Sequence, residues 1–527
     1  MKNINGRALT GEVPLDTVLE LEVSDLSPDF GKAEFATTQE LEPRSYASLQ
    51  LRAGRAVKQL LALAHEQVLV ICGSIWNDQP EIACDLVARH GGRAVLVKEP
   101  DRELILGSKK TGKAGLLDGS GILIMPCSYF IDHPKWIGRA EAKILGNKNL
   151  KLIFCGDATD CTQLELMWPF LNRALHTELV SEFSANNGLF LMGGMIAAYC
   201  ARAKLKPFDR EAVALLCMYS CRQSSSVRWL GILQTDFRSL LQQADAYAEG
   251  PVVTRANLLK AIAAKDFREN YIAESELREH RDMQILMETS GQTVGQINGL
   301  SVVETAGTSY EYGSPVRITA TLRAGGEGDV VDIERKAELA GQIHAKAMMI
   351  INGFISNEFA YDQGLPISAS LVFEQSYSEI DGDSASLTGL CAVLSAMSEL
   401  PIRQDLAVTG SVDQFGDIQP VGGVNEKIEG FFKICRLRGL SGTQGVIIPA
   451  SCVSQLVLKP AVVKAIAQGK FHIYAVAHVT GAMKLLTSCD WGDYDTENTI
   501  VHKIGERIDA VTQSRSLSAH PWWHFWG

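Results

Sequence analysis

The sequence predicts a multidomain protein of the α/β and α+β classes, in which an α/β module with a helical lid precedes an α+β domain. Three observations predict this order. From residue 48 to about 205, apolar runs that suit buried strands alternate with helical stretches, as in a parallel sheet. A block of helical pattern then covers 206–284. Near residue 290 the residue pattern changes to one typical of strands and turns, and then to a mixed α/β pattern.

The boundaries follow from these changes of pattern. In the α/β module we expect a helix at 51–65, strands at 68–73 (VLVICG), 94–97, 121–125 (GILIM) and 151–156, and a helix near 81–90. We divide the chain into an N-terminal segment (1–47), the α/β module (48–205), a lid-like helical region (206–284), an α+β domain (285–490) and a C-terminal tail (491–527). The tail ends in HPWWHFWG, and two readings stay open: packing on its own domain, or contact with a partner or a membrane surface.

Composition excludes several classes of protein. The chain has 527 residues and a formal net charge of -11, which argues against a nucleic-acid-binding protein with a basic footprint. It begins without the apolar core of a secretory signal and has no window of about 18 apolar residues, so we expect a cytoplasmic protein. Its 12 cysteines form no CxxC pair, a usage typical of free thiols and not of disulfides or structural zinc.

One segment fits the phosphate-binding pattern GxxxxGK, at Gly107–Lys113. A phosphate loop needs a following helix and a Ser or Thr after the lysine, whereas here Ala114 follows and a glycine-rich stretch leads into a strand. The strand–loop–helix pattern at 68–87 has no Gly-Lys, and the strand at 121–125 runs into Pro126-Cys127-Ser128 with no acid for a metal. The module is therefore expected to act as a scaffold and not as a motor.

The stretch EIDGDSASL places Ser384 before an apolar helical run, and Lys427 follows it by 43 residues in the first turn of another expected helix. Taken alone, Ser384 reads as a helix cap and Lys427 as a solvated lysine. Taken together, they suit nucleophilic catalysis, because a buried lysine with a lowered pKa can deprotonate a serine, and a helix start favours a developing oxyanion.

These residues resemble a known family. The segments DGDSAS and TGSVDQFGDIQPVGGVNEK are similar to the two signature segments of the Lon proteases, a DGxSA serine, then TG, then PxGGxxxK with its lysine 43 residues after the serine. The GDSAS and TGS variants resemble the LonB branch. The resemblance covers roughly residues 285–490 and, more loosely, the preceding blocks, which resemble the degenerate AAA+ module and lid of bacterial Lon-like homologues.

The resemblance implies roles for individual residues. Two small departures, Ser386 and Ser411, look like branch variation. His344 reads as a packing residue and receives no chemistry, and His520 and His524 lack the glutamate of a zinc-binding HExxH motif. The implied site has Ser384 as nucleophile, Lys427 as general base, Thr409 orienting the lysine, Asp381 either tuning the site or capping a helix, and an oxyanion held by backbone N–H groups near Asp383–Ala385.

The resemblance also implies a function: a serine-type endopeptidase that degrades unfolded or damaged proteins and assembles as a homo-oligomer, with six subunits in a ring. Binding of ATP and Mg²⁺ is implied only by the family resemblance, and no cofactor-binding or metal-binding residue is assigned. Protein or peptide substrates are the expected partners, without nucleic acid or membrane. Two alternatives stay open: an ATP-dependent protease with a noncanonical nucleotide site, and a non-catalytic assembly or adaptor protein that keeps the fold.

Overall fold

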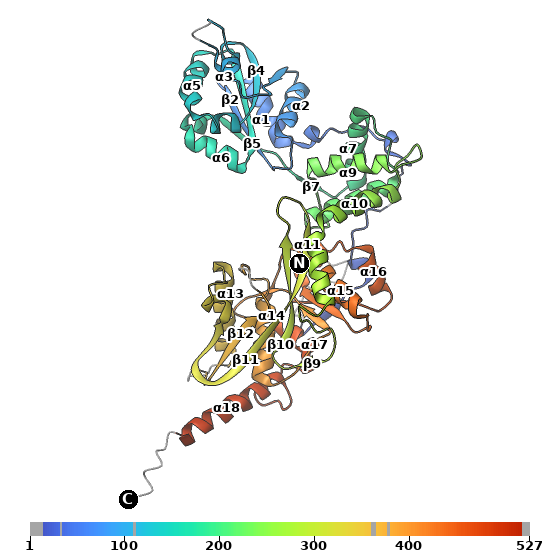
Figure 1. The fold of residues 1–527 in the computed structure, drawn as a ribbon, viewed down its shortest axis with the longest axis vertical. Helices are drawn as coiled ribbons and strands as arrows, with labels where there is room; N and C mark the ends of the chain where they lie inside the picture. The colour runs from blue at the N-terminus through green and yellow to red at the C-terminus, as the bar shows by residue number, and fades with distance from the viewer. Residues whose placement is uncertain (1–13, 32–33, 109–111, 360–364, 377–379, 519–527) are drawn as a thin grey trace, which may run out of the picture. The chain divides into compact units, whose positions relative to one another are not determined.

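A computed structural model describes residues 14–31, 34–108, 112–359, 365–376 and 380–518 (Figure 1). The chain packs into two compact units. The N-terminal unit comprises Phe30–Ser224 and Arg228–Ala264, and the C-terminal unit comprises Met1–Asp29, Ser225–Val227 and Lys265–Gly527. This division follows packing alone, so the domain boundaries given above stay predictions.

The N-terminal unit contains the predicted parallel sheet. Its five strands run in the order β3-β4-β5-β2-β6, and every pairing is parallel. Alternate residues of β2 face opposite layers: Leu69 and Ile71 pack with α1 and α2, whereas Val68 and Val70 pack with α5 and α6. Figure 1 shows these two pairs of helices on opposite sides of the sheet. The elements are α1 (Leu51–Ala62), β2 (Val68–Gly73), α2 (Gln79–Arg89), β3 (Ala94–Leu96), α3 (Arg102–Leu106), β4 (Gly121–Pro126), α4 (Ser128–Ile131), α5 (Ile137–Gly146), β5 (Leu150–Asp157), α6 (Ala158–Met167) and β6 (Leu175–Glu178).

A largely helical part completes this unit, and the helical pattern predicted after the α/β block is present. The short strands β7 and β8 pair antiparallel beside the helices. The elements are β7 (Glu182–Ser184), α7 (Gly188–Ala203), α8 (Arg210–Gln223), β8 (Trp229–Gly231), α9 (Gln234–Ala246) and α10 (Arg255–Glu269), the last of which continues into the C-terminal unit.

The C-terminal unit has a mixed seven-stranded sheet in the order β1-β18-β17-β14-β10-β11-β12. Strands β18, β17, β14 and β10 are parallel, and antiparallel strands flank them on both sides. The strands are β1 (Val18–Glu20), β9 (Gln292–Thr293), β10 (Gln296–Glu304), β11 (Glu311–Asp332), β12 (Ile367–Phe373), β13 (Ile402–Arg403), β14 (Leu406–Val408), β15 (Ser411–Val412), β16 (Ile418–Gln419), β17 (Gly445–Pro449) and β18 (His472–Val476).

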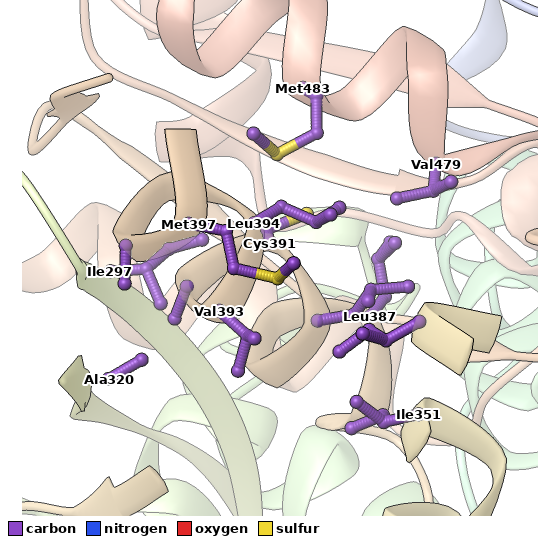
Figure 2. Close-up of a cluster of buried hydrophobic side chains, with 14 of the residues drawn as sticks. Ile297, Ala320, Ile351, Leu387, Cys391, Val393, Leu394, Met397, Val479 and Met483 are labelled. Carbon is purple, nitrogen blue, oxygen red and sulfur yellow. The ribbon is translucent and has the colours of Figure 1, made fainter. Parts of the chain in front are cut away.

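Helix α14 (Ser386–Ser398) forms the centre of this unit, and all of its residues are buried. A helix that is buried on every side packs against partners on every side, and Figure 2 shows them around Leu387, Cys391 and Leu394. The other helices are α11 (Tyr271–Arg281), α12 (Ile333–Lys336), α13 (Gln342–Phe359), α15 (Val424–Arg438), α16 (Pro460–Ala467), α17 (Val479–Thr487) and α18 (Ile500–Ser518).

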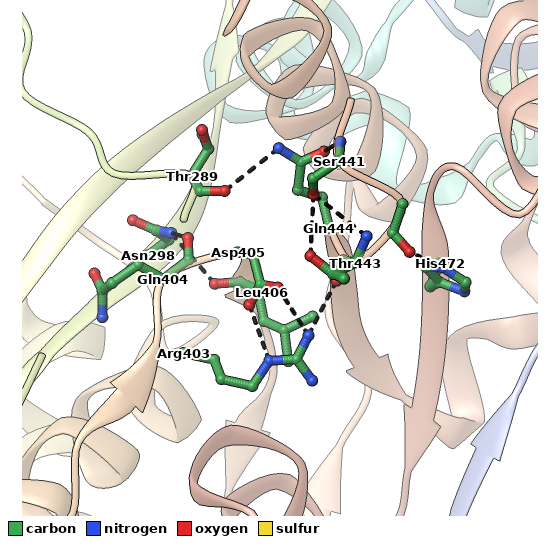
Figure 3. Close-up of polar contacts among 11 residues, drawn as sticks. Thr289, Asn298, Arg403, Gln404, Asp405, Leu406, Ser441, Thr443, Gln444 and His472 are labelled. Atoms are coloured by element: carbon green, nitrogen blue, oxygen red, sulfur yellow. Dashed lines mark hydrogen bonds and ion pairs between the residues drawn. The ribbon is translucent and has the colours of Figure 1, made fainter. Parts of the chain in front are cut away.

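A polar network fixes the start of β14, the strand that leads to Thr409 (Figure 3). The fully buried Asn298 amide of β10 donates to the carbonyl oxygens of Gln404 at 2.8 Å and Leu406 at 3.3 Å. The Arg403 guanidinium forms two bonds with the Asp405 carboxylate, at 2.8 and 2.9 Å. Because the Asn298 bonds tie the start of β14 to β10, the sheet sets the position of Thr409, which follows β14.

Part of the range predicted as a C-terminal tail packs on the C-terminal unit. The predicted tail contains α18, whose residues Ile500, Val501 and Ile504 are buried in the core. The aromatic end HPWWHFWG lies outside the described residues. Of the helices in the described ranges, none combines the length and apolarity needed to cross a bilayer.

Candidate active site

Ser384 lies on a turn that immediately precedes α14. The chain reaches it through a β-bridge between Ile380 and Ala340 and through Gly382, whose φ of 138° favours glycine. The N-cap of α14 is Ala385, and no described side chain caps this helix. The half-buried Ser384 is therefore not the cap that its sequence context first suggests.

Lys427 is the fourth residue of α15, and only 3% of it is exposed. Burial disfavours its ammonium form and lowers the pKa of the side chain from 10.5 to about 8, against smaller raising effects from Cys452 and Asp383. A pKa near 8 leaves about a tenth of the amine neutral at pH 7. The lysine can therefore accept a proton near neutral pH.

Thr409 connects the two residues. Lys427 Nζ donates to Thr409 Oγ1 at 3.2 Å, and the same hydroxyl donates to the carbonyl oxygen of Ser384 at 3.3 Å. Thr409 is fully buried, and its N–H donates to Ile447 on β17. In the described part of the chain no hydrogen bond joins Lys427 Nζ directly to Ser384 Oγ. Catalytic contacts of this kind often tighten only when substrate binds.

The two aspartates near Ser384 have different surroundings. Asp381 Oδ1 accepts a hydrogen bond at 3.1 Å from the N–H of Ile343, at the start of α13, so this carboxylate caps a neighbouring helix. Asp383 accepts a bond at 3.0 Å from the Ser411 hydroxyl, and its charge reaches Lys427. Of these two carboxylates, Asp383 is the one coupled to the lysine.

Two hydroxyl groups that sequence reasoning treated as departures belong to the site. Ser411 Oγ holds Asp383, and Ser386 Oγ accepts a bond from the N–H of Val412 at 3.0 Å. Both tie the serine loop to the segment that follows Thr409. The signal for them is present in the sequence, since a hydroxyl residue stands next to each motif, but their pairing is visible only in three dimensions.

The backbone around Ser384 leaves donors available. The N–H groups of Ser384 and Ala385 donate no hydrogen bond to another described residue, whereas the N–H of Ser386 bonds to the carbonyl of Asp383. Backbone donors at the start of a helix can stabilise a developing negative charge. This arrangement fits an oxyanion site beside the serine.

His344 is a buried packing residue on α13. Its Nε2 lies 3.2 Å from Asp332 Oδ2, and its ring stands edge-on to Phe373. Although burial favours the neutral acid, the contact with His344 lowers the pKa of Asp332. Within the described ranges, no cluster of three or more His, Cys, Asp or Glu residues could hold a metal ion.

The loop after β2 in the N-terminal unit differs from a phosphate site. The Asp78 side chain accepts a bond from the N–H of Glu81 at 3.1 Å and caps α2, which places a carboxylate where a phosphate would bind. Glu81 in turn pairs with Arg238 at 2.7 Å and also with Arg202. These side chains border a cavity of about 150 Å³ between α2, α7 and α9.

Two other segments considered for a nucleotide site are Gly107–Lys113 and the end of β4, and each makes contacts within its own surroundings. A β-bridge joins Ser108 to Lys113, and residues 109–111 between them lie outside the described residues. Strand β4 leads to Cys127, which is fully buried and lies 3.8 Å from Cys161, sulfur to sulfur.

Comparison with known proteins shows which proteins the site resembles. The model of the Lon protease (S16) C-terminal proteolytic domain matches residues 367–486, a range that contains Ser384, Thr409 and Lys427. A Lon protease homologue of Escherichia coli (strain K12) is 47% identical over 281 residues, 53% of this chain and 48% of the relative. A Lon protease homologue of Haemophilus influenzae is 38% identical over 386 residues, 72% of this chain and 63% of the relative.

An archaeal Lon protease of Pyrococcus abyssi is 28% identical over 262 residues, 49% of this chain and 24% of the relative. The matches thus span about half to two thirds of the two bacterial relatives and a quarter of the archaeal one. The predicted resemblance to this family is confirmed.

Proposed function

Because residues 367–486 match the Lon protease (S16) C-terminal proteolytic domain and two bacterial Lon protease homologues are 47% and 38% identical to this chain, we propose that it is a serine-type endopeptidase of the Lon family. Its substrates are unfolded or damaged proteins, which it cleaves through Ser384 and Lys427 by way of an acyl-enzyme. The observation that carries this proposal is the buried Lys427 amine, with a pKa of about 8, bonded to a threonine that also contacts the Ser384 backbone.

The reaction has two steps. Neutral Lys427 Nζ takes the proton of Ser384 Oγ as this oxygen attacks the scissile carbonyl, and the ammonium then returns the proton to the leaving amine. In the second step Lys427 Nζ takes a proton from the water that attacks the ester. It returns this proton to Ser384 Oγ as the bond to the acid product breaks. The N–H groups of Ser384 and Ala385 hold the oxyanion in both steps, which is supported by the absence of other described acceptors for them.

We further propose that the N-terminal unit is a degenerate AAA+-like module that no longer drives unfolding. In support, Asp78 occupies the start of α2, and Glu81 neutralises Arg202 and Arg238. A polyphosphate would meet a carboxylate at this helix start and would have to displace Glu81 from both arginines. Substrates must then arrive already unfolded or be unfolded by another protein.

Two properties are proposed on family resemblance alone. The chain acts as a homo-oligomer, a ring of six subunits with its sites facing an inner chamber, and it works in the cytoplasm. Light scattering of the purified chain tests the first property, and fractionation of the source cell tests the second.

Degradation of fluorescent casein tests the function. Wild type, Ser384→Ala and the exposed control Ser454→Ala are compared with and without ATP and Mg²⁺. We expect equal cleavage by wild type and control, independent of ATP, and a loss of at least about 10³-fold in Ser384→Ala. Cleavage stimulated by ATP would favour the ATP-dependent alternative. No cleavage under any condition would favour the non-catalytic assembly protein.

A further inference from the structure

The first turns of α15, which carry Lys427, lie directly against the backbone of β11. A Cβ atom on Gly313 would stand 2.0 Å from the carbonyl oxygen of Glu426 and 2.9 Å from Lys427 Cα. A Cβ atom on Gly430 would stand 2.3 Å from the carbonyl oxygen of Gly313. These obstacles are backbone atoms, which cannot rotate away, so each glycine allows the other segment to approach.

The segment Cys452–Lys459 also binds the beginning of α15. The Asn425 amide donates to the carbonyl oxygen of Gln455 at 2.9 Å, and its oxygen accepts from the N–H of Val457 at 2.7 Å. The Cys452 sulfur accepts from the N–H of Val421 at 3.4 Å. Asn425 and Cys452 are both buried, so these bonds are costly to lose.

Together these contacts restrain the backbone on both sides of Lys427. A lysine has a flexible four-carbon side chain, so its amine is only as well placed as its Cα and the walls around it. A general base must stay within hydrogen-bonding distance of the proton it takes, and a displacement of about 1 Å can cost about 100-fold in rate.

We propose that Gly313, Gly430 and Asn425 are positioning residues for Lys427. They hold the first turns of α15 so that the amine stays buried beside Thr409. None of them touches substrate, and the inference rests on the proposed function, in which Lys427 is the base. If the restraint loosens, water reaches Nζ and the cost of burying the ammonium falls. The small fraction of neutral amine that can act as a base at neutral pH then falls further.

The test compares Gly313→Ala and Asn425→Ala with matched controls on α13. Gly353→Ala adds a Cβ that meets only the flexible Gln414 side chain, at 3.4 Å. Asn352→Ala removes a similar set of bonds on α13, since the Asn352 oxygen accepts from the N–H of Val330 and its amide donates to the carbonyl oxygens of Val330 and Met348. The controls therefore report the general cost of such substitutions.

Two measurements are made on each full-length variant. The first is kcat and KM for a fluorogenic peptide across pH. The second is the pH dependence of Lys427 acetylation by acetic anhydride, followed by peptide mass spectrometry, which reports the amine whether or not the protein cleaves peptides. We expect kcat to fall about 30-fold or more with KM nearly unchanged, and the Lys427 midpoint to rise from about 8 by about one unit. Both controls should keep the wild-type kcat and midpoint.

The outcomes separate the two proposals. If Ser384→Ala stays active or wild type never cleaves, the proposed function fails, and the acetylation midpoints still decide the restraint on Lys427. If cleavage requires Ser384 and Lys427 but both test variants keep the wild-type kcat and midpoint, the positioning role is wrong and the function stands. Should Gly313→Ala fail to fold, Asn425→Ala decides alone.

Discussion

Helices α2 and α15 each begin after a strand and a short loop, and each has a glutamate in its first turn, but only α15 buries a lysine there. In α2 the Asp78 carboxylate caps the helix, and Glu81 pairs with two arginines in a partly exposed cluster. In α15 the N-cap is Gly423, and the first turn buries Lys427.

A helix start carries a partial positive charge, so it stabilises the acids of α2 and disfavours a cation on α15. Burial and the helix dipole therefore act together on Lys427, and both favour the neutral amine. The comparison teaches that the positive end of a helix can be neutralised by a carboxylate cap, as in α2, or can help to keep a buried lysine neutral, as in α15. The following four predictions test this contrast.

The largest effect is expected for Lys427→Met. Loss of the base should lower kcat by about 10³-fold, whereas the exposed control Lys464→Met should keep the wild-type rate. The same variant should be more stable than wild type at pH 7, because it no longer buries an ammonium.

The sign of the pH dependence of this stability difference follows from the lowered pKa of Lys427. Below pH 8 the lysine is charged in both the folded and the unfolded chain, so the full cost of burial applies, at most about 3 kcal/mol. Between pH 8 and 10.5 the unfolded chain binds more protons, so the stability of wild type rises with pH. Thermal melts at pH 7 and pH 10 should therefore show the advantage of Lys427→Met shrinking, and a constant advantage would contradict a buried ammonium.

A smaller effect is expected for Thr409→Val, which keeps the side-chain shape but removes the bond to Lys427 Nζ. We expect kcat to fall by about 10- to 100-fold with KM little changed, since the amine loses its orientation. Thr409→Ser retains the hydroxyl and should recover most of the rate. Equal rates in Thr409→Val and wild type would show that Thr409 does not orient Lys427.

Substitutions of Asp383 and Asp381 should have different effects on the pH dependence of kcat. Asp383→Asn removes a charge that raises the pKa of Lys427, so the acid limb of kcat should move to lower pH, by about a few tenths of a unit for this exposed carboxylate. Asp381→Ala should leave the limb in place and cost about 1 kcal/mol in the free energy of unfolding, through its cap on α13. A shift of the limb in Asp381→Ala alone would reverse these assignments.

The smallest effect is expected in the N-terminal unit. Glu81→Gln breaks the ion pairs with Arg202 and Arg238 and should cost about 1 kcal/mol or less, because partly exposed pairs contribute little. High salt should reduce the difference in melting temperature between wild type and variant. Isothermal titration should detect no ATP binding to wild type at micromolar concentrations, and saturable binding would contradict the degenerate module.

Local pattern was enough to predict the parts of the fold that are periodic in sequence. The strand VLVICG and the helix that carries Lys427 both follow from short runs of residues, and the structure contains them as β2 and α15. That Ser384 and Lys427 share one site could be predicted only from the family resemblance, because no local rule brings residues 43 positions apart together.

Contacts between distant segments were not predictable in this way. Strand β1 pairs with β18 from the opposite end of the chain, and a run of three residues carries no signal for that partner. The same holds for Asp381, whose role as a cap of α13 depends on the bridge between Ile380 and Ala340. The sequence around Asp381 is compatible with both tuning and capping, and only packing distinguishes its surroundings from those of Asp383.

The complete burial of α14 has a consequence for how the site responds to heat and denaturant. Amide protons of a helix enclosed on every side exchange with solvent mainly when the whole unit opens, so α14 should be among the last segments to exchange. Ser384 immediately precedes this helix. Its position is therefore coupled to the global unfolding of the C-terminal unit, and a protease built on it would lose activity together with its fold, without a partly melted intermediate.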